Sequence, residues 1–176
     1  MRWPWSKPST PEDVPELLRD ADRLFRAGHQ KKAVRLYRRV LKADGRNLPA
    51  LVNLGGLYSQ SPKTLPESRV LLERAREIEP DNSTVLLNLG AIYAYLNRLD
   101  EALVCLNRLE ETDAEYPGLR YNRANVLFRM GRVRDAFVEI QEELRAHPKN
   151  PNAILLQEVL RQRIEQGPTE ADDPEC

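Results

Sequence analysis

Residues 51–58 read LVNLGGLY, and residues 86–93 read LLNLGAIY. Both segments hold the arrangement Leu-x-x-Leu-Gly-x-x-Tyr without a change of residue type, and they lie 35 residues apart. The part that follows recurs more loosely, since Ser68 is echoed by Ala102. Self-similarity at this period is typical of repeat architectures, in which one unit cannot bury its apolar face alone and stacking on a neighbour stabilises it.

Small residues recur at the places where two helices of one repeat would meet. Two antiparallel helices approach within about 8–10 Å only where a side chain is short. The expected pairs, first helix before second helix, are Gly55 with Ser68, Gly90 with Ala102 and Ala124 with Ala136. This pattern resembles the tetratricopeptide repeat. The resemblance covers about residues 13–165 and implies an all-α fold, a right-handed helical-repeat solenoid.

The period divides the chain into four helix-turn-helix repeats and a capping helix. We place the repeats at about 14–47, 48–82, 83–116 and 117–150, and the capping helix at 151–165. Residues 1–12, which hold Trp3 and Trp5, are expected to form a flexible tail. Residues 166–176 are expected to form a disordered acidic tail.

Local signals predict where several helices begin. Asp13, with Glu16 three residues later, fits a capping box at the start of the first helix. The extra residue of the second repeat falls in Ser61–Pro66, whose prolines favour a turn between two helices. Asn150 is the expected cap of the final helix. The predicted inner face of that helix consists of Ile154, Leu155, Leu156, Val159, Leu160 and Ile164.

Charge and hydropathy exclude several classes of partner. The chain has 27 Lys and Arg against 27 Asp and Glu, so a zero net charge gives no reason to expect nucleic acid as a partner. No apolar run is long enough for a membrane span, and the N-terminus lacks the apolar core of a secretory signal. We therefore expect a cytoplasmic protein.

The residue types that carry catalysis or bind metals do not form sets at useful spacing. His29 and His147 fall in turns of different repeats, without partners for a triad or a ligand set. Cys105 is expected to be a small buried apolar residue, and Cys176 to be inert. We expect no enzyme, no cofactor and no metal site.

Asn53, Asn88 and Asn122 form a ladder, one in the first helix of each of repeats two to four. At about 100° per residue they lie nearly opposite the packing seam. The resemblance implies that this face lines a concave groove that binds an extended segment of another protein. An asparagine amide offers a donor and an acceptor to a peptide backbone. The other predicted groove residues are Arg19, Arg26, Tyr95, Tyr121, Asn125 and Arg129.

The predicted function is therefore a protein–protein interaction module, an adaptor or an assembly or chaperone-like factor. Related cochaperones hold acidic C-termini through a two-carboxylate clamp, but Leu18, Asp22 and Thr84 occupy clamp positions here, and no register supplies the clamp. A self-associating structural scaffold is the alternative. A second candidate surface is the basic face of the second helix of repeat one, otherwise a solvated surface: Lys31, Arg35, Arg38, Arg39 and Lys42.

Overall fold

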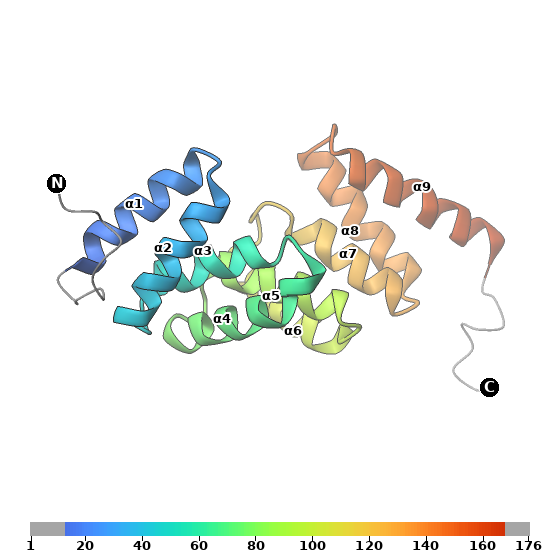
Figure 1. Ribbon diagram of the computed structural model, residues 1–176. Coiled ribbons are helices and arrows are strands. Elements are labelled where there is room, and N and C mark those ends of the chain that lie inside the picture. Colours follow the sequence, from blue (N-terminus) through green and yellow to red (C-terminus); the bar gives the residue numbers. More distant parts are fainter. Residues whose placement is uncertain (1–12, 168–176) are drawn as a thin grey trace. The chain divides into compact units, whose positions relative to one another are not determined.

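The computed structural model describes residues 13–167, and every regular element among them is helical (Figure 1). The helices are α1 (Val14–Arg26), α2 (Gln30–Ala43), α3 (Leu48–Tyr58), α4 (Leu65–Ile78), α5 (Ser83–Tyr95), α6 (Leu99–Thr112), α7 (Leu119–Arg129), α8 (Val133–Ala146) and α9 (Pro151–Gln166). The predicted all-α, helical-repeat fold is confirmed. The predicted Trp-containing tail lies outside the described residues, as does the acidic tail apart from its first two residues.

The chain divides into two compact units, Met1–Asn88 and Leu89–Cys176, with the division inside α5. In the first unit α1 packs on α2, α2 on α3, and α3 on α4. In the second unit α6 packs on α7, α7 on α8, and α8 on α9. Each unit thus buries its apolar side chains between helices that follow one another in the sequence.

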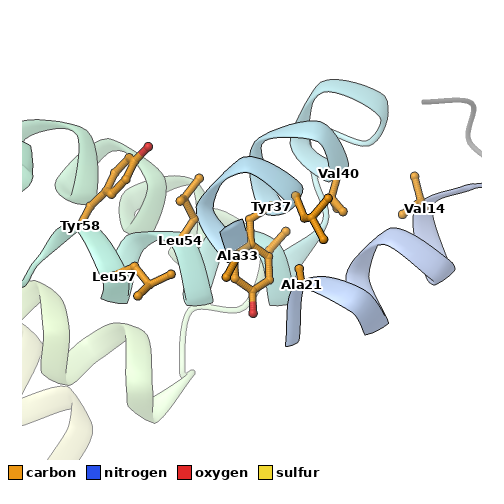
Figure 2. Packing of buried hydrophobic residues seen from close by; sticks show 10 residues of the cluster. Val14, Ala21, Ala33, Tyr37, Val40, Leu54, Leu57 and Tyr58 are labelled. Carbon is orange, nitrogen blue, oxygen red and sulfur yellow. The ribbon is translucent and has the colours of Figure 1, made fainter. Parts of the chain in front are cut away.

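The core of the first unit runs between α1, α2 and α3 (Figure 2). Ala21 and Ala33 are fully buried, so α1 and α2 approach closely. Tyr37 is fully buried beside them, and Leu54 extends the same cluster onto α3. The second unit has an equivalent cluster around Ala124, Ala136 and Ile140. Large side chains therefore fill the space on either side of the small ones, as the repeat pattern predicts.

Gly55 marks the closest approach of α3 to α4. A Cβ at this position would lie 2.7 Å from Cγ of Leu72, which is fully buried. The Ser68 hydroxyl also donates a hydrogen bond of 2.7 Å to the Gly55 carbonyl. In the second unit a Cβ at Gly90 would lie 2.8 Å from Cγ of Leu106. The leucine one turn after the predicted small partner therefore makes the tightest contact.

Two expectations about the helix ends hold, and one is wrong. Asn150 caps α9, since its side chain accepts hydrogen bonds from the backbone N–H groups of Asn152 and Ala153. The turn between α3 and α4 contains the short 3-10 helix Pro62–Thr64, as the prolines indicate. Asp13 does not form a capping box: its backbone is already helical, with φ −83° and ψ −12°, and its side chain accepts no cap hydrogen bond. That backbone geometry differs from the extended one that a capping side chain needs.

The predicted inner face of α9 is also partly wrong. Leu160 is fully buried and Leu156 is half-buried, whereas Leu155 is 68% exposed and Ile154 is 49% exposed. Only one helix, α8, covers α9 extensively within the described residues. Because α8 covers only a narrow face of α9, it cannot bury all the apolar residues of that helix. Some of them therefore face outward.

Substituting Gly55 and Gly56 tests the close approach with a matched pair in one helix. Gly55→Ala should lower the free energy of unfolding by about 1–3 kcal/mol, because the added methyl group overlaps the buried Leu72. Gly56→Ala should raise it by about 0.5–1 kcal/mol, because a Cβ there meets nothing within 4 Å and alanine favours the helix. Urea denaturation of both variants measures the difference. Equal effects of the two substitutions would contradict the packing argument.

Candidate functional site

The three ladder asparagines lie in the middle of the first helices of their repeats. Asn53 belongs to α3, Asn88 to α5 and Asn122 to α7, and all three are half-buried. Asn53 and Asn88 are in the first unit, and Asn122 is in the second. Each amide is therefore partly packed against the protein and partly exposed, where a ligand could contact it.

A hydrogen-bonded cluster holds Asn53 in the first unit. The Asn53 side-chain Nδ2 donates to Asp22 Oδ1 over 3.1 Å, and the Tyr37 hydroxyl donates to the same oxygen over 2.6 Å. Burial raises the pKa of Tyr37 well above its usual range, and the hydrogen bond to Asp22 raises it further. Tyr37 therefore stays a neutral donor. The hydrogen bond to Asp22 fixes the orientation of the Asn53 amide, and its side-chain oxygen can then accept a hydrogen bond from a ligand.

The other two ladder amides differ from Asn53. The Asn122 side-chain Nδ2 donates to the Gly118 carbonyl one turn earlier, over 2.8 Å. The Asn88 side chain makes no hydrogen bond with any residue in the range 13–167. Asn53 and Asn122 thus each use one side-chain N–H within the protein, whereas Asn88 uses none within residues 13–167. Sequence reasoning did not predict this difference, because it depends on the backbone and on Asp22.

The remaining predicted residues fall into two groups. Arg129 is tied down within the second unit: it donates to the Ala94 carbonyl and, over 2.9 Å, to Asn97 Oδ1. Tyr121 is half-buried and packs against the core cluster around Ala124. The exposed or half-buried members without such ties are Arg19, Tyr95 and Asn125, together with Arg26, whose Nε donates to the Asp22 carbonyl over 3.4 Å.

A charge cluster between α6, α7 and α8 was missed at the sequence level. Arg123 lies between Glu110 and Glu139, at 3.2 Å from Glu139 Oε1, and Arg120 lies 3.6 Å from Glu139 Oε2. The Arg123 and Glu139 side chains are only 15% and 13% exposed. The signal was present, because Arg123 occupies the repeat position that holds leucine at residues 54 and 89.

Burial raises the pKa of the Glu139 carboxyl, although Arg123 and Arg120 act to lower it. A carboxyl with a raised pKa in the folded state contributes stability that is present at low pH. That contribution is lost as the pH rises through the folded-state pKa. The cluster therefore fills space between helices at an electrostatic cost at neutral pH.

Glu139→Gln tests this balance, because glutamine keeps the shape and does not titrate. From about pH 4 to about pH 7, the unfolding free energy of the natural protein should fall relative to that of Glu139→Gln. Glu101→Gln is the control of opposite sign, since its hydrogen bond from Arg98 lowers the pKa of Glu101. Urea denaturation across this pH range measures both. A difference for Glu139→Gln that runs the other way would mean that the arginines outweigh burial.

Similarity to known proteins agrees with the repeat geometry. Residues 63–117 match the profile of the tetratricopeptide repeat. A 110-residue stretch, 62% of this chain, is 29% identical to the protein CTR9 homolog of Arabidopsis thaliana, of which it spans 10%. A 133-residue stretch, 75% of this chain, is 25% identical to anaphase-promoting complex subunit 3 of Schizosaccharomyces pombe, of which it spans 20%. The chain thus covers a small part of these relatives.

Two solved structures share the fold at 20% identity. The structure of MamA superposes with a TM-score of 0.74, covering 86% of this chain and 82% of that one. YrrB, described as a TPR protein with an unusual peptide-binding site, superposes with a TM-score of 0.73 over 89% of this chain and 80% of its own. Among residues 13–167, no helix has the length and apolarity that a bilayer crossing requires. The nine α-helices of the described residues and these matches together show that the chain has the helical-repeat fold of solved tetratricopeptide-repeat proteins, with the family's profile matched over residues 63–117.

Proposed function

We propose that this protein binds an extended peptide segment of another protein through the ladder amides on its first helices. The observation that carries the proposal is the orientation of Asn53. Asp22 holds its nitrogen, so its oxygen is set as an acceptor for a backbone N–H of the ligand. An amide fixed before binding loses less conformational entropy on binding than a free one.

Backbone recognition explains why asparagine would suit this position. Asn53 and Asn88, both in the first unit, lie on successive first helices, which pack about 10 Å apart in such repeats. An extended peptide rises about 3.3 Å per residue, so each amide would meet about every third residue. Arg19, Arg26 and Tyr95 are exposed residues that would then set the side-chain preference. In the second unit the corresponding contacts come from Asn122 and Asn125, each unit acting by itself.

The test begins with decapeptides selected on the natural protein from a randomised display library. The triple variant Asn53→Ala, Asn88→Ala, Asn122→Ala should bind the selected peptides at least about 10-fold more weakly, because several hydrogen bonds of about 0.5–1.5 kcal/mol are lost. Fluorescence anisotropy measures the affinity. The thermal melt should remain cooperative and shift down only modestly, because the hydrogen bonds of Asn53 to Asp22 and of Asn122 to Gly118 are lost with the side chains.

Two exposed asparagines on other helices give the matched control. Asn107→Ala on α6 combined with Asn152→Ala on α9 should leave peptide affinity as it is. The single variant Asn88→Ala is the cleanest member of the series, because Asn88 has no side-chain hydrogen bond to lose within residues 13–167. Unchanged affinity in the triple variant would place the peptide elsewhere and reject the proposal.

Self-association is a second candidate function, and α9 is the observation that favours it. Ile154, Leu155 and Val159 are exposed on this helix, with Leu155 at 68%. A second copy of the chain would remove these side chains from water, at about 25 cal/mol per Å² of apolar surface. Exposed apolar groups of this kind mark interaction surfaces when they are contiguous.

Sedimentation velocity over a range of protein concentrations tests self-association. The natural protein should show a concentration-dependent dimer that Leu155→Lys abolishes, because a buried lysine would be unpaired at the contact. Leu155 is mostly exposed, so the substitution should not disturb folding. A monomer at all concentrations would exclude self-association. It would not bear on the proposal of peptide binding.

A further inference from the structure

We propose that a groove between α2 and α4 of the first unit, on a different surface from the ladder, binds an acidic peptide segment that carries a bulky apolar side chain. The groove has a volume of about 700 Å³, within the range of ligand-binding pockets. Leu54 and Tyr58 of α3 form its floor, and Figure 2 shows both leaving the same side of that helix. Leu41 lines it from α2, and Val70 and Leu71 line it from α4.

In the second unit, the repeat positions that correspond to the groove are occupied by charged side chains. In the repeat register Leu41, Leu54 and Leu71 correspond to Glu110, Arg123 and Glu139. Those three charged residues meet one another in the cluster between α6, α7 and α8. In the first unit three leucines take their places. The position that is closed by ion pairs in one unit is an apolar groove in the other.

Tyr58 supplies a polar group that points to a ligand. The residue is 9% exposed and lines the groove, and its hydroxyl is buried without a hydrogen-bond partner. A buried hydroxyl in that state costs free energy, which a ligand oxygen or nitrogen could recover. The Arg38 guanidinium lies over the Tyr58 ring at 5.6 Å from its centroid, so a cation covers the face of this ring.

The rim of the groove sets the charge of the partner. Arg38, Lys42 and Arg74 line it against one acid, Glu67. The helix that provides one wall, α2, contains six Lys or Arg and no Asp or Glu in Gln30–Ala43. The chain as a whole has no net charge, so this positive charge is concentrated locally. Carboxylates on the partner would be attracted to the rim while an apolar side chain enters between the leucines.

Valine at one repeat position gives a matched pair of variants. Val70 on α4 lines the groove and is 48% exposed, whereas its repeat equivalent Val138 on α8 is 57% exposed and lies next to the charge cluster residue Glu139. About half of each valine side chain is exposed, so a glutamate at either site can direct its carboxylate into solvent with a similar, limited loss of buried apolar surface. Val70→Glu places a negative charge and extra bulk in the groove, and Val138→Glu makes the same change elsewhere.

The probe is a fluorescein-labelled decapeptide library with Leu, Phe or Trp at its centre and Asp or Glu on either side. The natural protein should bind it, and Val70→Glu should weaken the binding at least about 10-fold while Val138→Glu leaves it unchanged. Arg38→Gln with Lys42→Gln, two exposed changes, should weaken it and reduce its salt dependence between about 50 mM and about 300 mM NaCl. Tyr58→Phe should weaken it about 2- to 10-fold without loss of thermal stability.

Several results would overturn the proposal. Equal binding of a library with Lys in place of the acids would show that the groove does not select peptides by their negative charge. Equal binding of a library with Ala at the centre would show that no apolar side chain enters. A concentration-dependent dimer abolished by Val70→Glu, without peptide binding, would assign the groove to a second copy. Tighter probe binding after deletion of residues 168–176 would assign it to the chain's own acidic end. The ladder variants should not change this binding, so the two proposals fail independently.

Discussion

Antiparallel helices in this protein meet where a side chain is missing or short, and the rest of each unit follows from that contact. At Gly55 the backbone of α3 comes so close to Leu72 that no Cβ fits, and Ser68 adds a hydrogen bond to the Gly55 carbonyl. The contact fixes which faces of α3 and α4 point inward. It thereby fixes which faces remain for partners.

Two surfaces result from this constraint, and their chemistry differs. The ladder face presents asparagine amides, one of them oriented by Asp22 and Tyr37. The groove face of the first unit presents leucines between basic residues. We propose the first as a surface for a peptide backbone, whose N–H and C=O groups are common to all sequences. The second suits particular side chains, because an apolar cavity and a positive rim select by size and charge.

Equivalent positions in different repeats hold residues of different chemistry within the same fold. Residues 54 and 123 occupy the same place in their repeats, yet one is a buried leucine and the other an arginine held between two glutamates. A repeat needs only its small and large packing residues to remain in register. A buried position outside the small-residue contact can therefore change from apolar to ionic without a change of fold.

The sequence by itself determined the all-α repeat fold, the turn around Pro62, the cap at Asn150 and the burial of Cys105, because these depend on neighbours in sequence or on a strict period. It also predicted the ladder of Asn53, Asn88 and Asn122 as a feature of the first helices. Only the tertiary structure decided that Asp22 holds Asn53, that Arg123 joins Glu110 to Glu139, and that Ile154 and Leu155 face outward. These outcomes depend on side chains from different helices and on how much of a helix its neighbours cover. The period of apolar residues predicts the direction of a side chain. It does not predict which group from another helix the side chain contacts, nor how much of a helix its neighbours cover.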